Sequence, residues 1–258
     1  MSDPAIDRNQ VLVFRKIDAI FAVLASSNRD LGLTEIARET DLSKATVHRI
    51  LATLVRYDYV DHGARDGSYR LGLRLFELGA ATQRRSDLRR RALPIMRALA
   101  KETGESIYLG IRRDHAVLCL DRIDGKHVEE LPWCVGCALP LNAGASARVL
   151  LAGMSDEALE AFLLEPLVAL TRFTTVDADS MRESVFRARS LGYAIGDEDI
   201  AVGVAAIGAP IWDSHGNVVA AISLAGVVER LTPDRAPHLV AAVKSAGRTI
   251  SQALGFSG

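Results

Sequence analysis

The sequence lacks the patterns that mark membrane-spanning, secreted and most catalytic proteins. None of its apolar runs approaches the roughly 20 residues that a helix needs to cross a bilayer, and its polar first ten residues argue against a secretory signal. It contains no GxSxG, HExxH or Walker-loop pattern, and no GxGxxG after a strand. Hydrophobic residues make up 49% of the chain and charged residues 24%. We therefore expect a globular, cytoplasmic protein that is not an enzyme.

Cysteine is scarce, and the three cysteines are Cys119, Cys134 and Cys137. An odd number without a secretion signal favours a reducing compartment. Cys134 and Cys137 have CxxC spacing, but no second CxxC and no paired histidines complete a zinc site. The nearby Pro132 and Pro140 disfavour the helix start of a thioredoxin-like motif. Two packed or idle thiols are the preferred interpretation, a redox switch is the alternative, and neither a metal nor a cofactor is expected.

The sequence also lacks a strong charge of either sign, with 31 basic and 32 acidic residues. Residues 1–80 contain eleven of each. Strong phosphate binding usually goes with a basic surplus, because affinity depends on counterion release. A neutral DNA-binding module would bind weakly, so two copies in a dimer are expected. Residues 81–91 carry a local surplus that either flanks DNA or forms a solvated helix face: Arg84, Arg85, Arg89, Arg90 and Arg91 against Asp87.

What the sequence does contain is a helix-turn-helix pattern at residues 33–59. Thr34 is expected to cap a short first helix and Ser43 a second one. Apolar residues of the second helix recur at i, i+3, i+4 and i+7, which gives one buried stripe: Val47, Ile50, Leu51 and Leu54. The remaining face suits a DNA major groove, and its candidate contacts are Ser43, Lys44, Ala45, Thr46, His48 and Arg49. An ordinary pair of packed helices is the alternative.

The residues that follow favour the DNA-binding interpretation. Two β-prone segments within residues 57–71 surround a turn rich in Gly and Asp, which predicts a hairpin. Arg65 lies near its tip, where it would meet DNA backbone or the minor groove. A helix over residues 13–26 completes the small core, with Ile17, Ile20, Phe21 and Leu24 on one face. Together these elements predict a winged helix.

The rest of the chain alternates between helical and β-type patterns. Residues 73–83 predict a linker helix, and the next helix is expected to end at Gly104, a natural left-handed stop. Thr232 and Pro233 are expected to open the final helix. The pattern predicts an α+β layer with an antiparallel sheet flanked by helices: helices at 88–103, 146–152, 155–164, 178–191 and 232–254, and strands at 106–111, 116–123, 127–133, 202–212 and 218–227.

Two features of this second part have competing interpretations. The acidic run Asp197, Glu198 and Asp199 is expected to be a solvated loop, with a polar ligand site at the sheet edge as the alternative. Residues 203–208 are small, and close packing of a strand explains them better than nucleotide binding does. The six histidines are scattered, and none has the spacing of a metal site.

Three segments, residues 42–54, 139–152 and 192–223, resemble in order the IclR family of bacterial transcriptional regulators. The resemblance implies a winged helix-turn-helix at residues 10–72, a linker helix at 73–87, and a GAF-like effector-binding and oligomerisation domain at 88–258. It further implies double-stranded operator DNA and a small organic effector as partners, and a homodimer or a dimer of dimers.

The resemblance also places a candidate effector site at Ala145, Ser146, Gly196, Ala206, Ser223 and Ala225. In family members that sense small keto acids, positions 196, 206 and 225 carry Asp, Cys and Ser. Their loss here predicts a roomier, more apolar pocket. The expected ligand is larger than glyoxylate or pyruvate, such as an aromatic acid or another hydrophobic metabolite held by Ser146 and Ser223. Asn142 replaces the usual histidine, which suggests a diverged pocket rim.

Two alternatives to an effector-controlled regulator stay open. One is a regulator that responds to redox state through Cys134 and Cys137. The other is a metabolite-binding protein or enzyme whose helix-turn-helix does not bind DNA.

Overall fold

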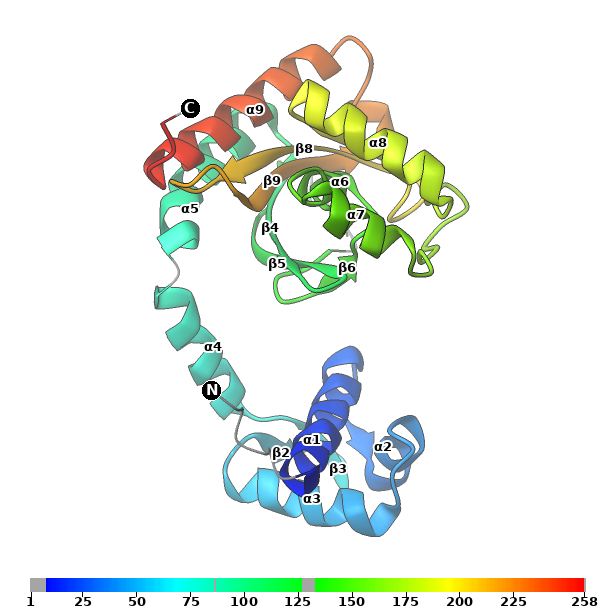
Figure 1. Cartoon of the computed structure of the whole chain (residues 1–258). Helices are drawn as coiled ribbons and strands as arrows, with labels where there is room; N and C mark the ends of the chain where they lie inside the picture. The colour runs from blue at the N-terminus through cyan, green and yellow to red at the C-terminus, as the bar shows by residue number, and fades with distance from the viewer. Residues whose placement is uncertain (1–7, 86, 127–132, 258) are drawn as a thin grey trace, which may run out of the picture. The chain divides into compact units, whose positions relative to one another are not determined.

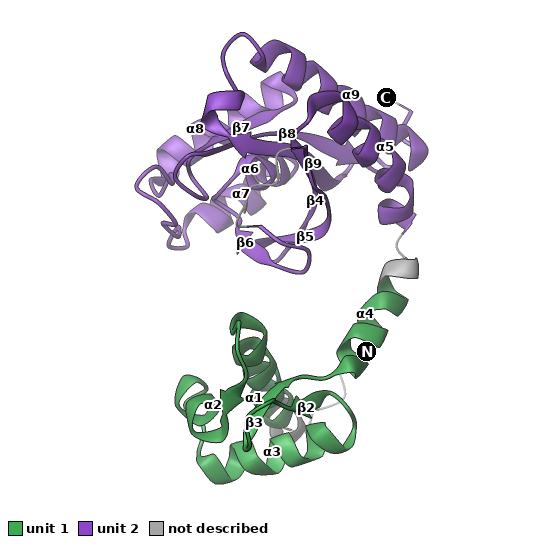
Figure 2. Cartoon of the chain, turned by 180° about the vertical axis from the view of Figure 1, so that it is seen from behind, with its two compact units in different colours: residues 1–85 green, residues 86–258 purple. Residues whose placement is uncertain are grey.

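The computed structural model describes residues 8–85, 87–126 and 133–257, and the chain forms two compact units, residues 1–85 and 86–258 (Figures 1 and 2). No helix in the described ranges is long and apolar enough to cross a membrane.

The first unit is a small helical core with a three-stranded antiparallel sheet in the order β1-β3-β2. The hairpin β2–β3 corresponds to the predicted wing, and Val60 pairs with Leu71 in it. Ile20, Ile36 and Leu51 are fully buried at the centre of the core. The elements are α1 (Arg8–Ser26), β1 (Leu31–Gly32), α2 (Leu33–Glu39), α3 (Lys44–Arg56), β2 (Val60–His62), β3 (Ser68–Leu71) and α4 (Leu73–Arg85).

Helix caps in this unit agree with the prediction at one position and differ at another. Ser43 caps α3, because its Oγ accepts the backbone N–H of Thr46 at 3.3 Å. The predicted Thr34 cap of α2 is wrong: α2 begins after Gly32, whose N–H donates to a carboxylate oxygen of Glu35 at 2.9 Å. An acidic side chain at this position satisfies a free N–H of the helix start from within the first turn.

The second unit is an α+β layer built on a six-stranded antiparallel sheet in the order β6-β5-β4-β9-β8-β7. The central strands are buried along nearly their whole length, because helices cover both faces (Figure 1). The elements are α5 (Asp87–Thr103), β4 (Ser106–Arg113), β5 (Ala116–Ile123), β6 (Ala138–Pro140), α6 (Ala145–Ala152), α7 (Asp156–Leu163), α8 (Ala178–Leu191), β7 (Ala194–Asp197), β8 (Val204–Trp212), β9 (Val218–Val227), the 3-10 helix η1 (Val228–Arg230) and α9 (Ala236–Ala253).

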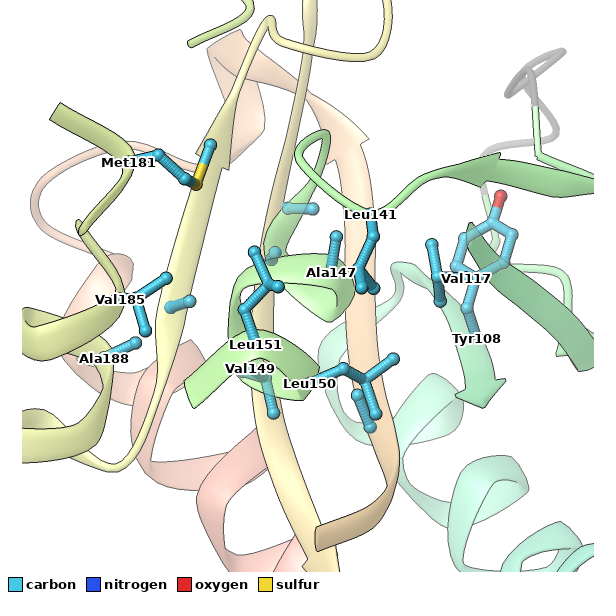
Figure 3. Packing of buried hydrophobic residues seen from close by; sticks show 14 of the residues in the cluster. Tyr108, Val117, Leu141, Ala147, Val149, Leu150, Leu151, Met181, Val185 and Ala188 are labelled. Atoms are coloured by element: carbon cyan, nitrogen blue, oxygen red, sulfur yellow. The ribbon is translucent and has the colours of Figure 1, made fainter. Parts of the chain in front are cut away.

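Two hydrophobic clusters fill the two sides of this sheet. On one side α6 lies against β4, β8 and β9, and α7 and α8 pack outside it. Figure 3 shows Leu151, Met181 and Val185 in this cluster, with Tyr108 at its edge. On the other side α5 and α9 pack together over the sheet, where Leu239 and Ile250 are fully buried.

Several predicted boundaries in this unit differ from the structure. Most of the predicted strand at 127–133 lies outside the described residues, and the short strands β6 and β7 were not predicted. Gly104 and Gly192 do end helices in the left-handed conformation, with φ of 77° and 70°. The final helix begins at Ala236, because the carbonyl of Thr232 accepts the N–H groups of Arg235 and Ala236 and so forms a turn first.

Candidate functional site

Helix α3 presents a polar face to solvent in the first unit. Of the predicted apolar stripe, Val47, Leu51 and Leu54 are buried and Ile50 is half-buried. The predicted DNA contacts Ser43, Lys44, Ala45, His48 and Arg49 are exposed, and Thr46 is half-buried. Ser43 Oγ also donates to Thr46 Oγ1 at 2.9 Å. These two hydroxyls therefore shape the helix start, whereas Lys44, His48 and Arg49 are exposed on the same face.

The cations of this face differ from those of the neighbouring helix. In α2, Arg38 forms an ion pair with Glu39 at 2.8 Å. Among the described residues, no acidic side chain forms an ion pair with Lys44, His48 or Arg49. Their charge is therefore available to phosphates and base edges.

The wing tip holds Arg65 by its backbone and leaves its side chain exposed. Ser68 donates both its N–H and its hydroxyl to the Arg65 carbonyl, at 3.1 and 2.6 Å. Asp30 accepts the N–H of Ala64 at 2.7 Å. Gly67 supplies the positive φ of 72° that the turn requires. The tip is thus an ordered loop carrying one exposed cation.

The arginine cluster after α4 is partly engaged within the second unit. Arg89 forms an ion pair with Asp121 at 2.8 Å, and Arg91 with Asp87 at 2.6 Å. Arg90 also pairs with Asp87, and Arg91 donates to the Ala253 carbonyl at 2.6 Å. Arg89 and Arg91 therefore tie α5 to β5 and to the end of α9, which weakens their predicted role beside DNA, whereas Arg90 pairs within α5.

In the second unit a cavity lies between the start of α6 and the sheet; we call it the α6 cavity. All six predicted effector positions line it: Ala145, Ser146, Gly196, Ala206, Ser223 and Ala225. The other lining residues are mostly apolar or aromatic, as predicted: Tyr108, Val117, Trp133, Leu139, Ala143, Gly144, Asp199, Ile200 and Val204. Its volume is about 30 Å³, room for about two waters. That the pocket is roomier than those of keto-acid sensors stays a prediction.

Few polar side chains face the α6 cavity. Ser146 Oγ donates to Ser223 Oγ at 2.8 Å, and both residues are buried. The Tyr108 hydroxyl is buried and has no hydrogen-bond partner in the part of the chain that the structure describes. Burial raises the pKa of Tyr108 to about 12, so its hydroxyl keeps its proton at neutral pH. The cavity thus offers one pair of serine hydroxyls and one tyrosine hydroxyl in a mostly apolar surround.

Asp199 belongs to the cavity wall. The prediction that the acidic run 197–199 is a solvated loop is therefore wrong for this residue. Only Asp197 of the acidic run is exposed. Asp199 is 3% exposed, and its Oδ2 lies 2.5 Å from Nη1 of the equally buried Arg148. The same oxygen accepts the N–H of Gly144 at 2.9 Å, immediately before α6. The pair therefore neutralises the acid and fixes the start of α6 at the same time.

Two glycines let α6 approach the sheet closely. A Cβ on Gly196 would lie 2.9 Å from both the Ala145 nitrogen and an oxygen of Asp199. A Cβ on Gly208 would lie 3.1 Å from the Ala145 carbonyl carbon. Both contacts are tighter than side chains normally tolerate. An aspartate at position 196 would therefore displace the helix start of this chain.

Asn142 does not line the α6 cavity, so the prediction of an altered rim at this position is wrong. Its side chain is 2% exposed. The amide donates to the carbonyls of Val168 and Thr175 at 2.9 and 3.1 Å, and accepts the N–H of Val168 at 3.2 Å. It therefore ties the connection between α7 and α8 to the start of the α6 segment.

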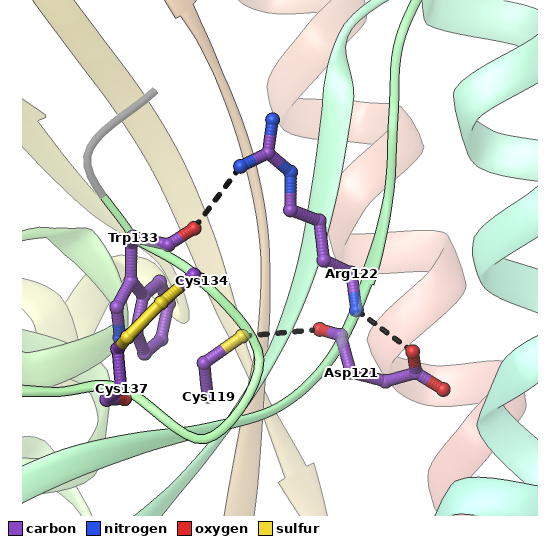
Figure 4. The surroundings of a disulfide bond; sticks show 6 residues. All are labelled: Cys119, Asp121, Arg122, Trp133, Cys134 and Cys137. Carbon is purple, nitrogen blue, oxygen red and sulfur yellow. Dashed lines mark hydrogen bonds between the residues drawn. A yellow bond between two sulfur atoms is a disulfide. The ribbon is translucent and has the colours of Figure 1, made fainter. Parts of the chain in front are cut away.

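Cys134 and Cys137 form a disulfide beside the cavity (Figure 4), so the preferred interpretation of two free thiols is wrong for this structure. The indole N–H of the preceding Trp133 donates to the Cys137 carbonyl at 3.1 Å. Cys119 is a buried free thiol, and burial raises its pKa to about 12. The described residues contain no cluster of three or more His, Cys, Asp or Glu side chains that would hold a metal.

Comparison with known proteins gives the family. Residues 16–63 match the family model described as the IclR helix-turn-helix domain, and residues 80–252 match that of the bacterial transcriptional regulator IclR C-terminal domain. The HTH-type transcriptional regulator KipR of Bacillus subtilis is 32% identical over 228 residues, which cover 88% of this chain and 91% of KipR. The transcriptional repressor IclR of Escherichia coli is 30% identical over 235 residues, or 90% and 86% of the two chains.

A solved structure agrees with these matches. The IclR homolog of Microbacterium hydrocarbonoxydans, complexed with 4-hydroxybenzoate, superposes with a TM-score of 0.81 at 25% identity, covering 94% of this chain and 98% of that one. The relatives are transcriptional regulators, so the alternative of a metabolite-binding protein or enzyme whose helix-turn-helix does not bind DNA is wrong. The chain belongs to the IclR family of transcriptional regulators, whose members bind operator DNA and small-molecule effectors.

Proposed function

We propose that the protein is a regulator whose operator affinity is set by a small aromatic acid in the α6 cavity. The observation that carries this proposal is the cavity wall. Tyr108 and Trp133 stack with ring centroids 5.3 Å apart and planes 19° apart, and alanines and glycines form much of the rest. Such a wall favours a flat apolar ring over a two- or three-carbon keto acid. The 4-hydroxybenzoate in the homologous structure supports the same class.

The acid group of the ligand would be bound near the serine pair. Ser146 and Ser223 are the hydroxyls on the α6 side of the cavity, and Ser146 lies in the first turn of that helix. The N–H groups of a first helical turn have no partner within the helix and favour an anion. Asp199 does not oppose this binding, because Arg148 neutralises it. A carboxylate at this position would receive hydroxyl and backbone donors together.

An aromatic acid exceeds the volume of about 30 Å³, so binding requires the wall to move. A ligand that stabilises a wider cavity shifts the population toward that arrangement. We propose that this shift changes the spacing of two α3 helices in a homodimer, or dimer of dimers, on DNA half-sites.

A ligand series tests the proposed class. Isothermal titration of the full chain should detect benzoate and 4-hydroxybenzoate, and show weaker or no binding of glyoxylate and pyruvate. Ser223→Ala should weaken binding of both aromatic acids by about tenfold, the value of one hydrogen bond to a charged group. Ser190→Ala, on the exposed surface of α8, is the matched control and should bind like wild type. A clear preference for glyoxylate would sink the proposal.

A redox response is a second candidate, favoured by the disulfide between Cys134 and Cys137 next to Trp133. Two thiols would exchange with one molecule of oxidised glutathione, forming the protein disulfide and releasing two molecules of reduced glutathione. The position of Trp133, and with it the cavity, would then depend on redox state. Replacing both cysteines by serine should abolish any effect of oxidised glutathione on DNA affinity. An unchanged oxidant response in that variant would remove this candidate.

A further inference from the structure

The hydroxyl of Tyr108 is a buried polar group without a function in the packing. Tyr108 is 2% exposed, and its hydroxyl oxygen has no partner among the described residues. A buried hydroxyl without a hydrogen bond destabilises a fold, whereas phenylalanine would fill the same space without that cost. Packing explains why an aromatic ring stands at position 108, but it does not explain the hydroxyl oxygen. A bound molecule that supplies a hydrogen-bond acceptor would remove this destabilisation.

The position of this oxygen is set by the sheet. Tyr108 on β4 is directly opposite Ser223 on β9, so both side chains stand on the face that α6 covers. The serine hydroxyl is bonded directly to its Cβ, whereas the ring of Tyr108 carries its oxygen to the far end of the side chain (Figure 3). The α6 cavity therefore has one hydroxyl pair near its floor and one hydroxyl at the far end of a ring.

Neighbouring groups hold the Tyr108 ring in one orientation. Trp133 stacks against it, and the guanidinium of Arg122 lies 5.4 Å from its centroid. Arg122 is itself held by Asp124 at 2.6 Å, and by the Trp133 carbonyl at 3.2 Å (Figure 4). The hydroxyl is therefore preorganised. Because burial keeps it protonated, it serves as a donor.

We propose that Tyr108 is a specificity-determining residue, and that its hydroxyl donates a hydrogen bond to a second oxygen substituent at the end of the effector opposite its carboxylate. This inference rests on the proposed function and narrows it to ring acids that carry a hydroxyl or oxo group remote from the acid. An unsubstituted or methyl-substituted ring would leave the Tyr108 hydroxyl unpaired. Sites that require a buried hydrogen bond reject analogues that lack the matching group.

The test compares two probes of similar shape, 4-hydroxybenzoate and 4-methylbenzoate, by isothermal titration of the full chain. Wild type should bind 4-hydroxybenzoate about tenfold more tightly. Tyr108→Phe should lower the affinity for 4-hydroxybenzoate about tenfold and leave that for 4-methylbenzoate unchanged, so that the discrimination disappears. Its melting temperature without ligand should equal or exceed that of wild type, because the unpaired hydroxyl is gone.

Tyr193→Phe is the matched control, because Tyr193 packs with the hydrophobic cluster on the other face of the sheet; it should bind both probes like wild type. If Tyr108→Phe keeps the tenfold discrimination, or weakens both probes equally, the role of Tyr108 is overturned and the proposed ligand class stands. If wild type binds neither probe, the ligand class is overturned and the role of Tyr108 with it. If Tyr108→Phe folds poorly, Tyr108→Leu takes its place in the test. It also lacks the hydroxyl and should lose the same discrimination between the two probes.

Discussion

The buried ion pair between Asp199 and Arg148 gives the sharpest test of how the α6 cavity is built. Asp199→Ala removes the partner of a guanidinium whose side chain is 8% exposed, and it removes the acceptor of the Gly144 N–H. Breaking a buried pair on one side costs about 3–5 kcal/mol, because the remaining charge stays buried without compensation. For a unit of this size, that loss lowers the melting temperature by roughly 6–20 °C.

Calorimetry and urea denaturation of the full chain measure this effect in the second unit. Asp197→Ala, two residues earlier and exposed, is the control and should change stability by no more than about 0.5 kcal/mol. The double variant Asp199→Leu with Arg148→Met should recover most of the loss, since an apolar pair of similar volume often replaces a buried ion pair without cost. A loss below about 1 kcal/mol in Asp199→Ala would refute the reasoning, because the pair would then be effectively solvated.

Four further predictions concern the DNA-binding unit and Cys119. Arg49→Ala should abolish specific operator binding in footprinting but leave effector titrations unchanged; an unaltered footprint would count against α3. Lys44→Ala should weaken DNA binding and reduce the salt slope by about one. The ion pair with Arg29, and then the Gly32 N–H, lower the pKa of Glu35 to about 2. The ionised Glu35 therefore stabilises the folded protein fully above its unfolded-state pKa of about 4.3. This stabilisation is lost as the pH falls through about 2. The melting temperatures of wild type and Glu35→Gln should converge over that range, and a constant difference would contradict this assignment. Cys119 should resist alkylation by iodoacetamide at neutral pH in the folded protein, and rapid labelling would show that it is accessible.

Local signals explain what could be predicted from the sequence. Ser43 capping α3 and Gly192 ending α8 act within a few residues of themselves, so the chain encodes them directly. The strands β8 and β9 were predictable because both of their faces are covered, which requires long uninterrupted apolar runs. The short strands β6 and β7 carry no such pattern. Gly196 and Asp197 are poor strand formers, and pairing with β8 alone makes that segment a strand.

The parts of the site that were missed depend on residues far apart in the chain. The burial of Asp199 follows from Arg148, which is 51 residues away, and the role of Asn142 follows from carbonyls 26 and 33 residues away. Neither distance leaves a local sequence pattern. The six cavity positions were found through the family resemblance, since four of them are alanine or glycine, which carry no chemical signal of their own. The Tyr108 hydroxyl became informative only when its burial and lack of a partner were known.

The most direct test of the central claim couples the two units in one measurement. Fluorescence anisotropy would follow binding of the full chain to DNA from upstream of its own gene, with and without 4-hydroxybenzoate. The account predicts a 5- to 150-fold change in affinity, the usual range of allosteric coupling, and a weaker response at the same ligand concentration in Ser223→Ala, which should still bind DNA like wild type. An operator affinity that the ligand leaves unchanged, or a full response in Ser223→Ala, would contradict it.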